Sequence, residues 1–326
     1  MSQPQFLSNC TADAMAAAAA NLASGALVAF PTETVYGLGA DATNAEAVAR
    51  IYSVKGRPAD HPLIVHVSSM QHIGDWARDV PEFAIALARD FWPGPMTLVF
   101  NRSELAKDFI TGGQDTVAVR VPDHVVALAL LQAFENIGGR GVAAPSANRF
   151  GQVSPTTAQA VSEEIGQYLS KGDQIIDGGA CTVGVESTII DCTGDAPRIL
   201  RPGAITVAMI EQSTGLAVDK TGSAFTDTEI RVSGSLENHY APAAAVLLCE
   251  KPLPGQGFIA LASIQTPPGV IRLASPVDDQ EFAQVLYAAL RAADAQGLAE
   301  VVVMQPIGVG IAVAIRDRLA RAANHK

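Results

Sequence analysis

The sequence has few cysteines, no long hydrophobic run and little positive charge. The four cysteines, Cys10, Cys181, Cys192 and Cys249, are scattered among 326 residues with no CxxC pair. This pattern is neither a disulfide framework nor a zinc site, and it fits a reducing compartment. No charge-free run reaches the roughly 18 residues that a membrane-spanning helix needs, and no signal peptide is visible. We therefore expect a soluble, cytoplasmic protein with no membrane association.

Positive charge is scarce, with 22 Lys and Arg residues against 33 Asp and Glu residues and a formal net charge of −11. Such a balance argues against an overall attraction to nucleic acid, although it is compatible with a local basic cleft. Apolar residues make up 48% of the chain and charged residues 17%, so a large core is possible and wholesale disorder is excluded. The length favours two domains over one.

Several sequence signatures of known chemistry are also absent. No GxxxxGK[ST], GxGxxG or GxSxG motif occurs, which excludes a P-loop, a dinucleotide fingerprint and a nucleophile elbow. Gly37-Leu38-Gly39 lacks the third glycine of the dinucleotide motif. His61 and His66 are five positions apart in a segment interrupted by proline, which is poor spacing for metal ligands.

Apolar runs alternate irregularly with helical patterns, which predicts an α/β fold with a mixed rather than purely parallel sheet. Predicted helices cover 11–24, 44–52, 81–90, 123–134 and 154–168. Predicted strands cover 26–30, 63–67, 96–100, 117–121, 142–144, 175–176, 185–192 and 199–201.

The C-terminal third has its own pattern. Residues 211–236 are rich in Thr, Ser, Gly and Asp, which is typical of a linker. Strands at 244–248 and 257–261, a helix at 279–296, a strand at 300–304 and a helix at 310–323 then predict a small α/β domain. We therefore predict a first domain over 1–210, a linker over 211–242 and a second domain over 243–326.

A basic turn, Lys55-Gly56-Arg57-Pro58, separates a predicted helix from a predicted strand. Arg offers a planar fork to phosphate or carboxylate and Lys a point charge, although an isolated turn of this kind is as often simply solvated. Polar residues also interrupt or end several apolar strands, where α/β proteins place their ligands. Each of these polar residues alone has a purely structural explanation, but together they favour an anion-binding α/β enzyme. The residues are His66, Arg120, Ser146, Asn148, Ser187 and Thr188.

A series of motifs resembles the YrdC/Sua5 family. The resemblance implies a YrdC-like twisted mixed sheet with flanking helices, plus the small Rossmann-like C-terminal domain of the long Sua5 type. It also implies nucleotidyltransferase activity: the family makes threonylcarbamoyl-AMP from L-threonine, bicarbonate and ATP, releases pyrophosphate and thereby supplies the threonylcarbamoyl modification of adenosine in tRNA. The motifs are PTETVYGLG, KGRP, HPLIVHV, WPGPMTLVF, VAVRVP, APSANRFGQVSPT, DGG, GVESTIID and ILRPGAI, over about residues 20–205.

The same resemblance implies the site residues by matching motif. Lys55 and Arg57 would be the catalytic cations on the triphosphate. The other ATP-binding positions would be Ser146, Asn148, Thr116, Ser154, Arg201, Tyr240 of the HYAP segment, and His61, which stands where the family usually has Asn. The threonine-binding positions would be Thr34, His66, Arg120, Ala144 and Ser187.

The resemblance further implies Mg²⁺ held through the ATP phosphates and by no protein side chain, and a threonylcarbamoyl-transferase complex as the downstream recipient. The linker before His239-Tyr240 is usually basic in the family, and here it reads SGSLEN. One alternative is an RNA-binding YrdC-like module without adenylate-forming activity. Another is a carbamoyl-transferring accessory domain like those in hydrogenase-maturation proteins, which normally accompanies zinc-finger and acylphosphatase segments that are not visible here.

Overall fold

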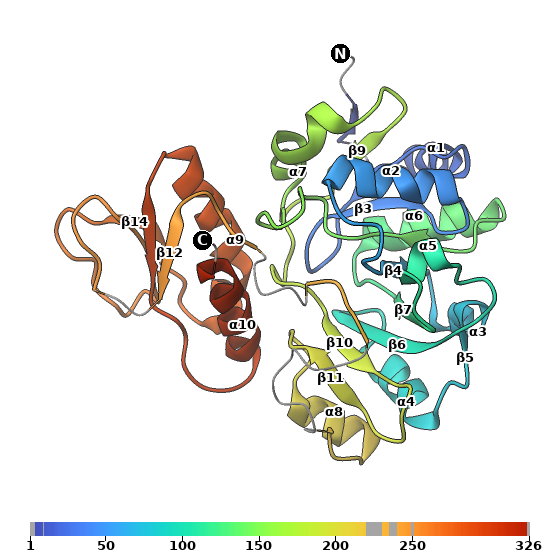
Figure 1. Ribbon diagram of the computed structural model, residues 1–326. Coiled ribbons are helices and arrows are strands. Elements are labelled where there is room, and N and C mark those ends of the chain that lie inside the picture. Colours follow the sequence, from blue (N-terminus) through green and yellow to red (C-terminus); the bar gives the residue numbers. More distant parts are fainter. Residues whose placement is uncertain (1–3, 9, 220–229, 235–239, 249–250, 325–326) are drawn as a thin grey trace.

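The computed structural model describes residues 4–8, 10–219, 230–234, 240–248 and 251–324. It has two parts, a larger domain on an 11-stranded mixed sheet and a smaller one on a four-stranded parallel sheet (Figure 1). The predicted α/β class and the mixed character of the large sheet are confirmed. Within the described residues, no helix is both long and apolar enough to cross a membrane.

The large sheet has the strand order β1-β9-β2-β3-β8-β4-β7-β6-β10-β11, with β5 paired to β6. This order makes β8, β4 and β7 neighbours in the middle of the sheet and places β10 beyond β6; these strands carry most of the predicted site residues or lead into them. The strands are β1 (Gln5–Leu7), β2 (Val28–Phe30), β3 (Gly37–Asp41), β4 (Ile64–His66), β5 (Ala77–Arg78), β6 (Met96–Arg102), β7 (Thr116–Arg120), β8 (Val142–Ala143), β9 (Gln174–Ile176), β10 (Thr188–Asp191) and β11 (Arg198–Arg201).

Helices cover both faces of this sheet. Along β2, Val28 and Phe30 belong to one apolar core with α1 and α6, while Ala29 belongs to another core on the opposite face with α2. The near-continuous apolar character of the strand follows from this two-sided burial. The helices are α1 (Ala12–Ala23), α2 (Ala45–Lys55), α3 (Ile73–Trp76), α4 (Glu82–Phe91), α5 (Asp108–Thr111), α6 (Val125–Asn136), α7 (Ala158–Ile165) and α8 (Val207–Thr214), with 3-10 turns at Met70–His72 and Gly166–Tyr168.

Several elements of the large domain were not predicted: the short β1, α3, β5 and α5, together with β3 and α8. Strand β3 has the sequence GLGAD, whose glycines disfavour an isolated strand, but it pairs antiparallel with both β2 and β8. Helix α8 ends at Thr214, so the segment predicted to be a linker from residue 211 begins inside a helix. The first domain therefore extends a few residues beyond its predicted boundary.

The C-terminal domain follows the predicted β-β-α-β-α order with one extra strand. Its parallel sheet has the order β12-β15-β13-β14, with β12 (Ala245–Leu248), β13 (Gly257–Ile259), β14 (Ile271–Ala274) and β15 (Glu300–Val303). The unpredicted strand is β14, a half-buried edge strand. Helices α9 (Asp279–Ala295) and α10 (Ile311–Ala323) lie on the side of this sheet that faces the large domain (Figure 1).

The two domains share an apolar core and approach each other closely. Val153 and Val185 of the large domain belong to the same buried cluster as the apolar face of α9. At Gly184 the contact is at backbone distance, because a Cβ at this position would lie 2.4 Å from the carbonyl oxygen of Ala283 and 2.4 Å from the Cα of Gln284. The smaller domain is therefore packed directly against the segment that precedes β10.

Candidate active site

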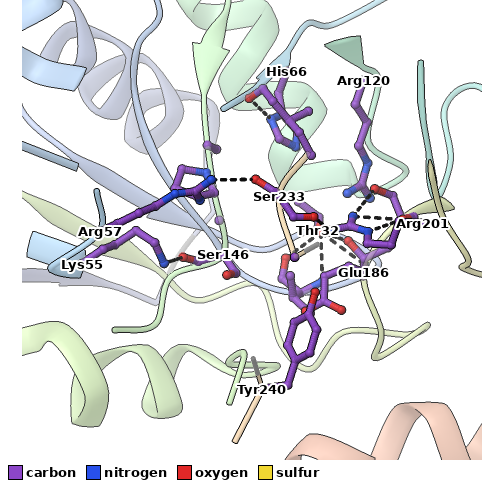
Figure 2. A pocket seen from close by; sticks show the side chains of 18 of the residues that line it. Thr32, Lys55, Arg57, His66, Arg120, Ser146, Glu186, Arg201, Ser233 and Tyr240 are labelled. Atoms are coloured by element: carbon purple, nitrogen blue, oxygen red, sulfur yellow. Dashed lines mark hydrogen bonds between the residues drawn. The ribbon is translucent and has the colours of Figure 1, made fainter. Parts of the chain in front are cut away.

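A cavity lies where the middle strands of the large sheet end (Figure 2). Its lining includes polar side chains from the segment after β2, the end of α2, β4, β7 and the segments around β10 and β11. The predicted site residues that line it are Thr34, Lys55, Arg57, His66, Arg120, Ala144, Ser146, Ser187, Arg201 and Tyr240.

The basic turn is built by the end of α2. Gly56 is the C-cap in the left-handed conformation, with φ 61°, and it turns the chain so that Arg57 follows Lys55 into the cavity. Lys55 Nζ donates to the carbonyl oxygens of Ser146 at 2.5 Å and Asn148 at 2.6 Å. Arg57 Nη2 donates to the Pro62 carbonyl oxygen at 2.8 Å and to Ser233 Oγ at 3.1 Å. The turn is thus buried and held by neutral acceptors.

Three cations of the cavity are buried and form no direct ion pair with a carboxylate of the described residues. Lys55, Arg57 and Arg201 are 2%, 8% and 4% exposed, and none of them takes part in an ion pair within the described part of the chain. Burial lowers the pKa of all three; in Arg57 it does so to about 10, and in Lys55 the nearby Arg57 adds to the effect. Because a buried charge without a counter-ion is costly, this side of the cavity favours an anionic ligand.

His66 and Arg120 form a second polar group. They are register partners on the parallel strands β4 and β7, so their side chains reach the cavity side by side. Burial first, and then the charge of Arg120, lowers the pKa of His66 to about 3, which keeps the imidazole neutral near pH 7. Its Nδ1 lies 3.3 Å from the Ile64 carbonyl oxygen, and the hydroxyls of Thr32 and Thr34, 2.9 Å apart, complete this group.

Arg120 has a partner that the sequence did not indicate. Its Nη2 donates to Glu33 Oε1 at 2.6 Å, and both side chains are about 95% buried, at 5% and 4% exposure. Glu33 Oε2 and Arg120 Nε have no hydrogen-bond partner among the described residues. The guanidinium is thereby fixed by one carboxylate while its Nε remains available for another ligand.

Ser187 is held in the cavity wall by Arg201. Its Oγ lies 2.8 Å from Thr97 Oγ1 and accepts from Arg201 Nη2 at 3.1 Å, and its carbonyl oxygen accepts from Arg201 Nε and Nη2 at 3.1 and 2.9 Å. Arg201 also donates through Nη1 to the Ser233 carbonyl oxygen at 2.8 Å. Arg201 therefore joins the segment before β10 to the linker residues that cross the cavity.

Five predicted residues lie outside the cavity lining. One of them, Thr188, is buried, and its hydroxyl donates to the Ile205 carbonyl oxygen at 2.8 Å. His61 stands at the rim, with its ring edge-on to the ring of Phe150 at 5.4 Å, and Phe150 itself lines the cavity. Thr116 lines a smaller adjoining cavity of about 280 Å³ that shares Ser233 with the larger one. Asn148 and Ser154 are also buried, and neither side chain lines the cavity.

The side chains of Asn148 and Ser154 have hydrogen-bond partners within the protein. Asn148 Nδ2 donates to the carbonyl oxygens of Arg149 and Gln152 at 2.7 and 2.8 Å, which shapes the loop that receives Lys55. Ser154 Oγ donates to Glu186 Oε1 at 2.7 Å. Both side chains already have protein partners, and their contacts with nucleotide stay predictions.

Sequence reasoning also missed several lining residues: Thr32, Glu186, Phe150, Ser233 and Gly234. The sequence places Glu186 in the predicted strand 185–192, where a carboxylate inside an apolar run is itself a signal of a functional position. Ser233 and Gly234 belong to the SGSLEN segment, and they contact the cavity although the segment lacks the usual basic residues. His239, which was predicted beside Tyr240, lies outside the described residues.

The described residues include no group of three or more His, Cys, Asp or Glu side chains that could hold a metal ion. The carboxylate in the lining, Glu186, is already bonded to Ser154, Tyr287 and Arg318. The donors that remain in the cavity are cationic or neutral. They fit a polyphosphate that carries its own metal ion better than a metal ion bound directly by protein carboxylates.

A two-domain α/β protein with a buried, cation-lined small-molecule pocket is the class that this fold and site define. Residues 20–203 match a family model for Sua5, YciO and YrdC proteins described as "telomere recombination". Residues 205–324 match a model described as "threonylcarbamoyl-AMP synthase, C-terminal domain". The chain belongs to the Sua5/YciO/YrdC family, in the form that carries the Sua5 C-terminal domain.

Similar proteins span nearly the whole chain. The threonylcarbamoyl-AMP synthase of Pyrococcus abyssi is 40% identical over 95% of this chain and 94% of its own length. The enzyme of that name from Schizosaccharomyces pombe is 35% identical over 91% of this chain and 85% of its own. The crystal structure of P. abyssi Sua5 complexed with L-threonine superposes with a TM-score of 0.86 at 38% identity, covering 98% of this chain and 97% of that one.

Proposed function

We propose that this protein is an L-threonylcarbamoyladenylate synthase, a nucleotidyltransferase that forms threonylcarbamoyl-AMP and pyrophosphate from L-threonine, bicarbonate or carbon dioxide, and ATP. Relatives of that name at 35–40% identity over most of the chain support the activity. The observation in this chain that carries the proposal is the group of three buried cations without carboxylate partners, Lys55, Arg57 and Arg201, in one cavity with the His66 and Arg120 group.

The reaction joins two anions, and this determines what the pocket must do. The neutral amine of threonine attacks carbon dioxide, forms a C–N bond and loses a proton, giving a carbamate. A carbamate oxygen then attacks the α-phosphorus of ATP while the bond to the β-phosphate oxygen breaks and pyrophosphate leaves. Because an anion attacks an anion, charge neutralisation and positioning should supply most of the acceleration.

The pocket residues divide between the two substrates in this proposal. Lys55 and Arg57 neutralise the triphosphate, with Ser146 beside them and Arg201 near the reacting phosphate. Arg120 receives the threonine carboxylate through the nitrogens that Glu33 leaves available. The neutral His66, Thr34 and Ser187 bind the amine and hydroxyl, and the backbone at Ala144 completes the pocket.

A Mg²⁺ ion, bound through the phosphates of ATP, would add further charge neutralisation during the displacement. The linker supports the exclusion of water, because Ser233 and Gly234 lie over the cavity and Ser233 is bonded to both Arg57 and Arg201. Exclusion of water matters because the mixed anhydride product is prone to hydrolysis. We propose a tRNA-modifying threonylcarbamoyl-transferase complex as the recipient of this product.

The direct test is incubation of the purified protein with ATP, Mg²⁺, bicarbonate and L-threonine. Threonine-dependent release of pyrophosphate and an adenylate product detected by mass spectrometry are expected. Serine in place of threonine measures selectivity for the methyl group. Pyrophosphate release that does not depend on threonine would contradict the proposal.

The basic turn is tested by Lys55→Met and Arg57→Met, which keep much of the apolar stem and remove the charge. Each is expected to lower the rate at least about 100-fold, because a buried charge contact to phosphate is lost. Arg78→Ala is the matched control, since Arg78 is 65% exposed and pairs only loosely with Asp79 at 4.0 Å. Near-normal turnover in both methionine variants, with unchanged circular dichroism, would refute the assignment of the turn.

A further inference from the structure

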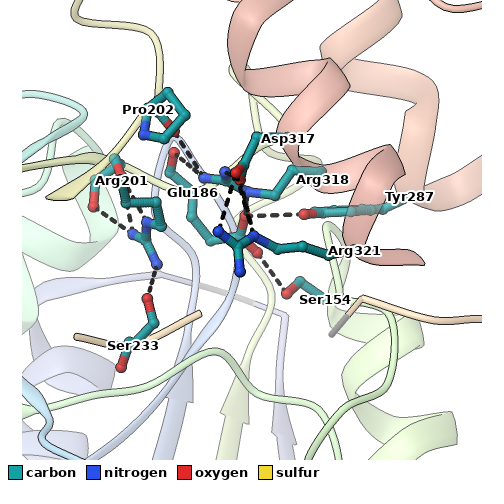
Figure 3. A network of polar contacts seen from close by, with 10 residues as sticks. Ser154, Glu186, Arg201, Pro202, Ser233, Tyr287, Asp317, Arg318 and Arg321 are labelled. Atoms are coloured by element: carbon teal, nitrogen blue, oxygen red, sulfur yellow. Dashed lines mark hydrogen bonds and ion pairs between the residues drawn. The ribbon is translucent and has the colours of Figure 1, made fainter. Parts of the chain in front are cut away.

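The carboxylate of Glu186 forms part of the cavity wall, but the C-terminal domain supplies most of its partners (Figure 3). Arg318 Nε, from α10, donates to Glu186 Oε2 at 2.7 Å. Tyr287 OH, from α9, donates to the same oxygen at 2.9 Å. The other oxygen accepts from Ser154. A wall residue of the large domain is thus held mainly by side chains that follow it by more than 100 positions in the sequence.

This contact is almost completely buried. The side chain of Arg318 is 0% exposed and that of Glu186 7%. Burial alone would raise the pKa of Glu186, but the charge of Arg318, with that of Arg201, outweighs it and lowers the pKa to about 2. Removal of one partner from a buried ion pair leaves an uncompensated charge, so Glu186 depends strongly on Arg318 for its place in the wall.

The same two side chains also contact Tyr240, which lines the cavity. The rings of Tyr240 and Tyr287 stack with centroids 5.9 Å apart at an interplanar angle of 21°. The guanidinium carbon of Arg318 lies 5.3 Å from the centroid of the Tyr240 ring. Tyr240 is 1% exposed and has φ 64°, a backbone conformation that non-glycine residues seldom adopt without support from their surroundings.

We propose that Arg318 and Tyr287 are positioning residues for the pocket: by holding Glu186 and Tyr240 from behind, the C-terminal domain completes the substrate site of the large domain. Glu186 can affect the substrate site through residues that it adjoins or contacts directly. Glu186 precedes Ser187, a wall residue of the proposed threonine subsite, and it fixes Ser154 directly. This inference rests on the proposed function only for its kinetic readout.

Arg318 reaches the cavity wall through a second contact as well. Its Nη2 donates to the Pro202 carbonyl oxygen at 3.0 Å, immediately after Arg201. Arg201 in turn holds Ser187 and Ser233. Because docking of the smaller domain orders these groups, substrate binding and domain docking should favour each other by the same factor.

Three variants test the proposal by steady-state pyrophosphate release. Tyr287→Phe keeps the ring against Tyr240 and removes one hydrogen bond to a charged acceptor, so KM for threonine should rise about three- to tenfold. Arg318→Met should lower kcat/KM at least about 100-fold. The double variant Glu186→Gln with Arg318→Met removes the buried ion pair, while Asp317, the other carboxylate partner of Arg318, keeps its ion pair with Arg321. Its thermal midpoint should therefore recover while its kcat/KM stays low.

Arg291→Met is the matched control. Arg291, on α9, forms another ion pair across the domain interface, with Glu164 at 2.9 Å, but neither residue lines the cavity. It should lower the thermal midpoint without raising KM. Recovery of wild-type kcat/KM in the double variant, or equal KM values in Tyr287→Phe and wild type, would overturn the proposal, because a purely stabilising contact behaves in that way.

A wild-type protein that releases no pyrophosphate would refute the proposed function but not this inference. In that case, threonine binding measured by calorimetry tests the positioning role of Arg318 independently of catalysis. Arg318→Met should bind threonine at least tenfold more weakly than Arg291→Met does, and equal affinities would overturn the inference.

Discussion

His66 occupies an environment in which only its neutral form is stable, and this has a measurable consequence for stability. Its pKa is about 3 in the folded chain and 6.5 when solvated. As the pH falls below 6.5, His66 therefore becomes protonated in the unfolded chain while it remains neutral in the folded chain. The contribution of His66 to stability is present in full above pH 6.5 and is lost progressively towards pH 3.

At pH 5 this loss should amount to about 2 kcal/mol. Urea unfolding of the wild type and of His66→Gln at pH 7 and pH 5 measures it. The variant lacks the titrating group, so its free energy of unfolding should fall less between the two pH values. Parallel losses in the two proteins would show that other groups cause the acid sensitivity.

The pair of Glu33 and Arg120 determines how the threonine subsite should be probed. Arg120→Met alone would leave Glu33 buried and unpaired, at a cost of about 3–5 kcal/mol. We therefore expect the double variant Glu33→Gln with Arg120→Met to fold more stably than Arg120→Met. Calorimetry should show threonine affinity reduced at least about 100-fold and ATP affinity changed by less than about threefold. Equal losses for both ligands would contradict the assignment of Arg120 to the threonine carboxylate.

At this scale the sequence indicated the charged and polar groups of the pocket but not their partners. Lys55, Arg57, His66 and Arg120 stood out because they interrupt or border apolar strands. Glu33 lies 87 positions from Arg120, and Glu186 lies 132 positions from Arg318. No local pattern encodes such pairs, because they depend on which strands and domains the fold brings together.

Among the elements, α2 has the most direct effect on the site, because its end positions the two cations. Gly56→Ala should destabilise the protein by about 1–2 kcal/mol, since an alanine is strained at φ 61°. A Cβ would also lie 2.6 Å from an Arg149 nitrogen, so the end of that side chain must shift, and the strain in the turn itself should lower turnover. Thermal unfolding and pyrophosphate release measure the two effects.

Gly166→Ala is the control for this substitution. Gly166 has φ −53°, and a Cβ there would lie no closer than 3.4 Å to its nearest neighbour outside the helix backbone, Ser162. It should change the free energy of unfolding by less than about 0.5 kcal/mol. A Gly56→Ala protein as active and stable as this control would show that the turn tolerates a side chain.

Elements with strong local signals were predictable, and elements defined by their neighbours were not. Helices α1 and α2 begin within one residue of their predicted starts at 11 and 44, where Thr11 and Asn44 cap them. Strand β3 is glycine-rich and exists because β2 and β8 pair with it. Strand β14 is a short edge strand without a clear alternation of apolar residues.

For the whole molecule, the distribution of charge separates an enzyme from an RNA-binding module. The net charge is −11, and Lys55, Arg57 and Arg201 are buried rather than displayed on the surface. We expect no retardation of tRNA in a gel-shift assay at about 0.15 M salt, because too few accessible cations face the phosphates. Micromolar binding that weakens steeply with salt would instead favour the RNA-binding alternative.

The backbone contact at Gly184 makes that position a natural spacer between the two halves of the molecule. A side chain there has no room beside Ala283 and Gln284, so it must push α9 outward. Alanine, serine and valine at 184 would form a series of wedges of increasing thickness. Such a series would vary the separation of the domains in steps. Turnover could then be measured as a function of that separation.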